Sequence, residues 1–202
     1  TLSSSSAASD VYKRQTVTLV GAVFSRVAGL SLPGAESSLS PVIDTLNGFA
    51  YFGTGTSPGR VVKIQLSDFS RVGAITLASG ENPLRSAVID TLNGFAYFGT
   101  YTSPGRVVKI QLSDFSRVGA ITLASGEDYL WSAVIDTLNG FAYFGTDTSP
   151  GRVVKIQLSD FSRVGAITLD SGENYLLSAV IDTLNGFAYF GTDTSLGRVV
   201  KI

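Results

Sequence analysis

Side chains that usually carry out catalysis are scarce in this 202-residue chain. It contains no histidine and no cysteine, which excludes imidazole base catalysis, thiol nucleophiles, disulfides and the usual zinc sites. Asp114 and Arg117 look like a paired acid and cation, but the same pair stands in every full copy of a repeated block. Because a catalytic site needs an asymmetric set of residues, we expect Asp114 and Arg117 to cap a turn.

Carboxylates are the main candidate metal ligands. Glu127, Asp128 and Asp147 offer oxygen atoms of the kind that calcium prefers, but their spacing matches no known calcium-binding loop. We therefore expect no metal and no cofactor, and we name no catalytic residue.

The positions that differ between copies are the most informative functional signal. From Val42 onward the copies differ in a loop after the second strand of each repeat and in the segment that leads into the next repeat. Antiparallel strands reverse direction at every turn, so both places should lie on the same rim of each unit. Loops on a rigid scaffold often carry binding residues. The candidate ligand-binding residues are Asn82, Arg85, Tyr101, Asp128, Tyr129, Trp131, Asp147, Asn174, Tyr175 and Asp193.

Two interpretations of this variable rim are open. Amphipathic aromatic side chains beside arginine, aspartate and asparagine suit the binding of a carbohydrate or of a protein loop. Alternatively, these loops only tolerate substitution, and Trp131, the single tryptophan, fills a gap between neighbouring repeats.

The segments that would position this rim are predicted to be β-strands. In one copy we expect strands at residues 86–90, 95–100, 106–112 and 119–123, with Asn93 and Gly94 in the first hairpin. The second strand is apolar on both faces, which is typical of a sheet packed between other sheets. Helical periodicity is absent. The copies repeat every 46 residues, as shown by Asp44, Asp90, Asp136 and Asp182.

Tandem units of four antiparallel strands predict an all-β fold, namely a fragment of a β-propeller. A β-trefoil and an open β-solenoid are the alternatives, but a trefoil closes with three copies, whereas this chain has three full copies and parts of two more. The small-Val-Ile-Asp strand, the Asn-Gly turn and the aromatic strand ending in Gly-Thr resemble bacterial and archaeal propeller repeats of the YVTN and NHL-like superfamily. The resemblance covers residues 16–202.

The first fifteen residues are expected to differ in origin from the rest of the chain. Residues 5–15 read SSAASDVYKRQ, which looks like a translated frame of a sequencing adapter, so we expect residues 1–15 to be a disordered artefact. We expect the rest to be a metagenomic-type propeller fragment truncated at both ends. Its expected parts are a partial blade at 16–40, full blades at 41–85, 86–131 and 132–177, and a partial blade at 178–202.

The composition limits the kinds of partner that we expect for this chain. The net charge is −1 with no basic stripe, which argues against nucleic acid, and no apolar run approaches the roughly 18 residues that span a membrane. We expect a non-enzymatic binding or adhesion propeller from a secreted or surface protein, with a carbohydrate or protein ligand. The alternative is a fragment of a propeller enzyme whose active-site blades are missing here, since the superfamily that the chain resembles includes hydrolases and oxidoreductases.

Overall fold

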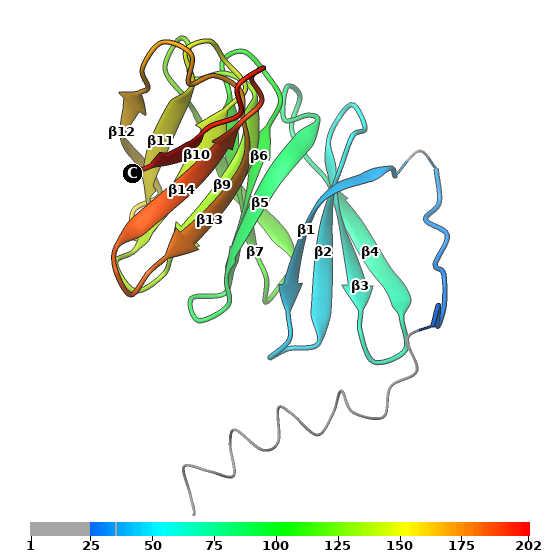
Figure 1. The fold of residues 1–202 in the computed structure, drawn as a ribbon. Coiled ribbons are helices and arrows are strands. Elements are labelled where there is room, and N and C mark those ends of the chain that lie inside the picture. Colours follow the sequence, from blue (N-terminus) through cyan, green and yellow to red (C-terminus); the bar gives the residue numbers. More distant parts are fainter. Residues whose placement is uncertain (1–24, 35) are drawn as a thin grey trace, which may run out of the picture. The chain divides into compact units, whose positions relative to one another are not determined.

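The computed structural model describes residues 25–34 and 36–202, and within them it contains strands and no helix. Figure 1 shows these strands in the order of the chain. They are β1 Ser38–Asp44, β2 Phe49–Thr54, β3 Arg60–Gln65, β4 Ser70–Thr76, β5 Leu84–Asp90, β6 Phe95–Thr100, β7 Arg106–Gln111, β8 Ser116–Thr122, β9 Leu130–Asp136, β10 Phe141–Thr146, β11 Arg152–Gln157, β12 Ser162–Thr168, β13 Leu176–Asp182, β14 Phe187–Thr192 and β15 Val199–Lys201.

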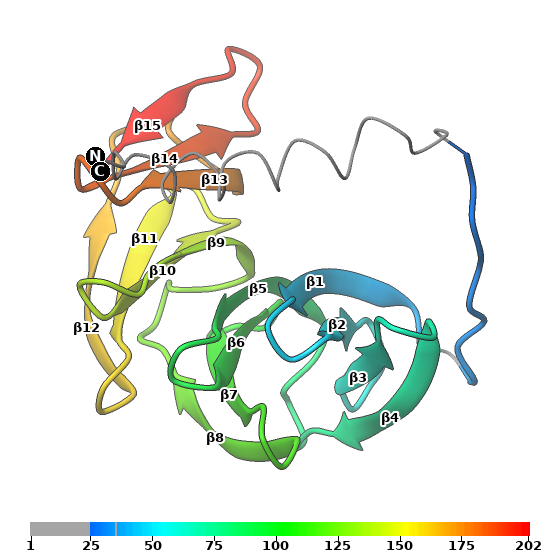
Figure 2. The ribbon, with the colours of Figure 1, turned by 90° about the horizontal axis from the view of Figure 1, so that it is seen from below.

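The strands form four antiparallel sheets, which confirms the predicted all-β repeat. Three sheets have four strands in chain order, and the fourth contains β13, β14 and β15. Their first strands pack against one another in the order β1, β5, β9 and β13, so consecutive sheets are neighbours (Figure 2). All four sheets lie in the unit formed by residues 32–202. We number the sheets one to four along the chain.

Each sheet begins with a hairpin whose loop is held by an aspartate. In the second sheet, Asp90 Oδ1 accepts a hydrogen bond from the Asn93 backbone N–H at 3.1 Å, and Asp90 Oδ2 accepts one from Asn93 Nδ2 at 2.7 Å. Only Gly94 of the Asn-Gly pair has a positive φ, at 75°. The loop is longer than a two-residue turn, since Asp90 pairs directly with Phe95. The aspartate therefore acts as the expected turn acceptor.

The second strands form the centre of the interfaces between sheets. Tyr97 and Phe98 on β6 point to opposite faces and are both fully buried, which confirms that this strand is packed on two sides. The Ser86 side chain donates a hydrogen bond to the Leu130 carbonyl of the next sheet at 2.9 Å. Gly99 faces the same neighbour, where a side chain would lie 2.8 Å from Leu130 Cβ. Close approach of neighbouring sheets therefore requires glycine at this position.

The observed sheets start earlier than the expected blade boundaries. The first strands begin at Ser38, Leu84, Leu130 and Leu176, whereas we expected blades to begin at residues 41, 86, 132 and 178. We also expected a third and a fourth strand within residues 16–32. Residues 25–34 form no strand, and the remainder of that segment, like residues 1–15, lies outside the described residues.

Candidate functional site

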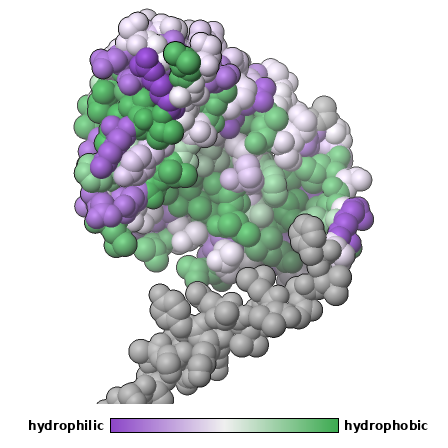
Figure 3. Space-filling view, in the orientation of Figure 1, coloured by the Kyte–Doolittle hydropathy of each residue, from purple (hydrophilic) through white to green (hydrophobic). Residues whose placement is uncertain are grey.

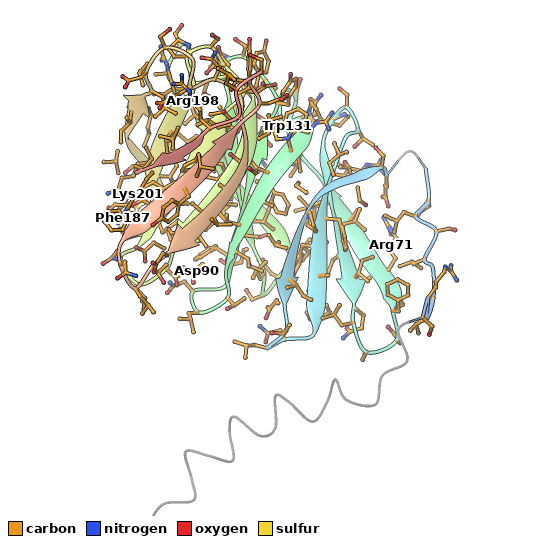
Figure 4. All side chains as sticks on the ribbon, in the orientation of Figure 1. Arg71, Asp90, Trp131, Phe187, Arg198 and Lys201 are labelled. Carbon is orange, nitrogen blue, oxygen red and sulfur yellow. The ribbon has the colours of Figure 1, made fainter. Side chains whose placement is uncertain are left out.

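The two variable regions lie on the same rim and are joined by backbone hydrogen bonds. Tyr101, in the loop after β6, donates its N–H to the Pro83 carbonyl at 2.8 Å, and Tyr129 donates to the Thr102 carbonyl at 3.0 Å. Asp147, after β10, donates to the Tyr129 carbonyl at 2.8 Å. Figure 4 shows Trp131 at the end of the sheets opposite to the hairpin that contains Asp90. The strand directions therefore place the variable positions as the sequence predicted.

Five of the ten candidate residues form a contiguous group between the second and third sheets. We call this group the aromatic cluster; it contains Arg85, Tyr101, Tyr129, Trp131 and Asp147. The Tyr101 ring lies 4.6 Å from the Tyr129 ring and 5.4 Å from the Trp131 ring, the latter nearly edge-on at 79°. The Arg85 guanidinium lies 4.9 Å from the Trp131 ring centre. Such ring and cation contacts each stabilise a cluster by about 0.5–1.5 kcal/mol beyond the area that they bury.

A hydrogen bond connects the aromatic cluster to the third sheet. The Tyr101 hydroxyl donates to Asp147 Oδ2 at 3.0 Å. This hydrogen bond, together with burial and the nearby charge of Asp147, raises the pKa of Tyr101 above its ordinary value. Tyr101 is therefore a neutral hydrogen-bond donor at physiological pH, and its phenol orients the Asp147 carboxylate.

Arg85 and Trp131 occupy the second positions of β5 and β9, although we expected them in the connecting segment. Trp131 is half-buried and contacts Tyr101 and Arg85 of the preceding sheet. It therefore contributes to packing between sheets while part of its surface faces solvent. The Nε of Arg85 is buried without a hydrogen-bond partner among the described residues.

The other five candidates, Asn82, Asp128, Asn174, Tyr175 and Asp193, lie on the same variable segments outside the aromatic cluster. Asn82 lines a cavity of about 200 Å³ with Ser57, Pro58 and Ser79. Tyr175 corresponds to Tyr129 in the next repeat; it is 40% exposed, and its carbonyl accepts a hydrogen bond from Asp193 N at 2.9 Å. Tyr175 and Asp193 thus meet at the rim of the fourth sheet, and among the described residues Tyr175 has no ring contact like that of Tyr129 with Tyr101.

Aromatic residues with a positive φ occur on both rims and not only on the variable one. Tyr129 and Tyr175 have positive φ values of 57° and 55°, which are uncommon for bulky residues. Phe115 has a φ of 51° in a turn on the opposite rim, where it packs against Tyr51 of the preceding sheet. Left-handed aromatic residues therefore serve both rims of this fold.

Each full sheet contains an ion pair between an arginine and a buried glutamate that we did not predict from the sequence. Arg117 does not cap its turn; it donates from Nε to Glu81 Oε2 at 2.8 Å, and its Nη2 also contacts this carboxylate. Glu81 is 1% exposed. Asp114 does hold the turn, where it accepts a hydrogen bond from the Ser116 hydroxyl at 2.8 Å. The signal was present in the sequence, because a glutamate and an arginine recur together with the repeat. The equivalent pairs are Glu36 with Arg71 and Glu127 with Arg163.

One of these ion pairs occupies Glu127, a carboxylate that we considered as a calcium ligand. The Glu127 carboxylate is engaged by Arg163, whose Nε donates to Glu127 Oε2 at 2.7 Å. In the described residues, no group of three or more acidic, histidine or cysteine side chains is arranged to hold a metal ion. The same part of the chain has no helix long and apolar enough to cross a membrane.

Comparison with known proteins identifies the fold. No protein-family model matches the chain, and no curated protein sequence matches it. A chain of the nidogen–laminin complex is 10% identical with a TM-score of 0.63, and the match covers 82% of this chain and 61% of that one. U3-55K is 10% identical with a TM-score of 0.66, and the match covers 85% of this chain and 50% of U3-55K. The WD40 repeats of RRP9 are 9% identical with a TM-score of 0.66, and the match covers 85% of this chain and 52% of that one.

WD40 repeats are β-propeller blades, so these likenesses, together with the tandem four-stranded sheets, show a β-propeller fold. The chain spans about half to three-fifths of the length of the solved chains that it matches.

Proposed function

We propose that this chain is a non-enzymatic binding propeller that recognises a protein partner through its variable rim. The observation that carries the proposal is the aromatic cluster: residues that differ between nearly identical repeats meet at one junction between sheets. Within the propeller fold, we infer from the strand and turn residues that the repeat is of the YVTN and NHL-like type.

The packing of the aromatic cluster favours a protein ligand over a carbohydrate. A sugar ring stacks on an open aromatic face, whereas Arg85 lies over Trp131, and Tyr101 is flanked by Tyr129 and Trp131. Tryptophan, tyrosine and arginine are enriched among residues that dominate protein–protein binding energy. One of the matched structures is a complex between two proteins, nidogen and laminin, which supports this use of the fold.

The buried carboxylates support a binding role more than an enzymatic one. Asp90 is fully engaged by Asn93, and Glu127 is engaged by Arg163 and by the Ala124 backbone. Equivalent contacts recur along the chain, so these acids hold turns and sheets in place. The enzymatic alternative would require unlike acids or bases from several blades to meet at one point.

Screening the 202-residue chain on a protein array and a glycan array would test the proposal. Once a ligand is found, Tyr101→Ala and Trp131→Ala should each weaken binding at least about tenfold, which corresponds to roughly 1.4 kcal/mol. Leu92→Ala is the matched control, because Leu92 is apolar, 79% exposed and lies in the hairpin loop of the opposite rim.

Circular dichroism should be unchanged in all three variants. Binding to glycans alone would contradict the protein ligand, and loss of binding in Leu92→Ala but not in the rim variants would contradict the choice of rim.

A further inference from the structure

Two buried side-chain atoms lack a hydrogen-bond partner among the described residues, and both belong to variable positions of the rim. They are Arg85 Nε and Asp128 Oδ1. An unpaired buried polar atom destabilises a fold, whereas the same atom paired with a partner does not. Figure 3 shows hydrophilic residues along the upper edge of the molecule, the end of the sheets at which Figure 4 labels Trp131. The rim is therefore a polar surface whose groups are incompletely paired within the described chain.

Arg85 differs from the other half-buried arginines of the described chain. Each of those donates a side-chain hydrogen bond to a carboxylate or to a backbone carbonyl; they are Arg60, Arg71, Arg106 and Arg152. The Arg85 guanidinium, by contrast, has no hydrogen bond and no ion pair with any described residue. Because arginine does not lose its proton in proteins, Arg85 is a cation that lacks an anion.

A bulge at the rim fixes the position of Arg85. In the ladder between β5 and β6, Leu84 and Ser86 each have a direct partner, and Arg85 between them has none. Trp131 is left out of the ladder between β9 and β10 in the same way. Bulges redirect a side chain out of the regular alternation of a strand. The two bulged residues of neighbouring sheets therefore meet at the rim.

Two rings hold the Arg85 guanidinium without occupying its hydrogen-bond donors. Its central carbon lies 4.9 Å from the Trp131 ring centre and 5.8 Å from the Tyr101 ring centre. A ring attracts a cation but offers it no carboxylate oxygen, so these contacts position the guanidinium and leave its N–H groups unpaired. Of its nitrogens only Nε is buried, so the terminal nitrogens reach solvent. An acceptor from a partner can approach them there.

Asp147 carries the opposite charge within the aromatic cluster but does not neutralise Arg85. Its carboxylate accepts the Tyr101 hydroxyl, and it forms no ion pair with Arg85. The negative charge of Asp147 opposes the entry of a doubly charged group at the same site. A singly charged carboxylate therefore suits Arg85 better than a phosphate group.

We propose that Arg85 binds an acidic side chain, an aspartate or a glutamate, of the protein partner. This inference rests on the proposed function, since it names the chemistry that the partner brings to the same rim. The guanidinium offers parallel N–H donors that match the two oxygens of a carboxylate. The rings of Tyr101 and Trp131 hold it in place before binding, so little side-chain freedom is lost when the carboxylate arrives.

Random linear peptides displayed on phage, selected on the full 202-residue chain, provide the probe. Peptides that bind the parent chain but not Trp131→Ala are rim binders, and we expect them to share an aspartate or a glutamate. Replacing that residue by asparagine or glutamine should weaken binding at least about tenfold. Trp131 is the only tryptophan in the chain, so its fluorescence reports the binding of tryptophan-free peptides at this site.

Arg85→Leu tests the arginine itself. A leucine already stands at the equivalent position of the fourth sheet, Leu177, so this substitution suits the fold. The variant should bind the acidic peptide and its amide counterpart with equal affinity, because the cation that discriminates between them is gone. Arg198→Leu is the control: it removes the same charge from an exposed arginine outside the aromatic cluster, and it should keep the full preference for the acidic peptide.

The outcomes separate this inference from the proposed function. If no selected peptide depends on Trp131, both fail. If rim-binding peptides share no acidic residue, or if Arg85→Leu with unchanged circular dichroism keeps the preference for the acidic peptide, the rim binds protein segments but Arg85 does not recognise a carboxylate. Stronger binding by a peptide with phosphoserine in place of the acid would also overturn the inference. The amide replacement is made in the peptide, so it decides the question even if Arg85→Leu does not fold.

Discussion

Glu127 and Arg163, 36 residues apart, form an ion pair that joins two neighbouring sheets. Arg163 Nε donates to Glu127 Oε2 at 2.7 Å, while the Ala124 N–H, just beyond β8, donates to the same oxygen at 3.0 Å. The Glu127 carbonyl also accepts the Gly105 N–H at 2.9 Å. Glu127 thus bonds to the second sheet through its backbone carbonyl and its side chain, and to the third sheet through its side chain.

Breaking this pair should destabilise the fold. Arg163→Ala leaves the buried Glu127 carboxylate without its cation, and we expect a loss of about 3 kcal/mol, the lower end for buried pairs because Arg163 is partly exposed. Arg198→Ala is the control, since Arg198 is exposed and makes no ion pair within the described residues. Its effect should stay within about 0.5 kcal/mol in denaturant unfolding. Equal losses in the two variants would contradict the role of the pair.

The free energy of unfolding should decrease in acid because buried glutamates such as Glu127 become protonated. Burial raises the pKa of Glu127, but the hydrogen bonds from Arg163 and Ala124 and the arginine charges outweigh it and hold the pKa below the ordinary 4.5. The unfolded chain therefore takes up the proton more readily. The contribution of Glu127 to the free energy of unfolding is complete above about pH 4.5 and is lost as the pH falls through the lowered pKa.

Glu127→Gln checks this pH dependence. The difference in unfolding free energy between the parent and Glu127→Gln should shrink as the pH is lowered below 4.5. A difference that stays constant down to the acid transition would show that the Glu127 carboxylate does not couple folding to proton uptake.

The second strand should be sensitive to loss of aromatic side chains. Phe98 is fully buried between the first and second sheets, so Phe98→Ala should cost about 3–5 kcal/mol in denaturant unfolding. Phe187 on β14 is 38% exposed, and Phe187→Ala should cost much less. A loss below about 1 kcal/mol for Phe98→Ala would mean that β6 is not a core strand.

Two glycines of the same sheet should respond oppositely to alanine. A Cβ at Gly99 would meet the Ser86 hydroxyl and would lie 2.8 Å from Leu130 Cβ, so Gly99→Ala should cost about 1–3 kcal/mol. A Cβ at Gly119 on β8 would have no atom within 4 Å, so Gly119→Ala should be neutral or stabilising by up to about 1 kcal/mol. Thermal unfolding of both variants tests how closely the sheets approach at β6.

Local features of this protein could be read from its sequence because their causes are local. The 46-residue repeat, the strand alternation and the Asp90–Asn93 hairpin depend on residues that are close along the chain, and the structure confirms the four-stranded antiparallel unit. Strand direction also sufficed to place Tyr101 and Tyr129 on one rim. Whether that rim binds a ligand stays a prediction.

Contacts between sheets could not be read in the same way. The Ser86 bond to Leu130, the ion pair of Glu127 with Arg163 and the contact of Trp131 with Tyr101 join residues that different sheets supply. Hydrophobic period and turn chemistry specify a strand and its face, but they do not specify the distance or angle at which the next sheet packs. The sequence alone therefore determined the repeating unit and its variable rim. The packing of the sheets decided which of the varied side chains became one cluster, because only close approach across a junction brings them into contact.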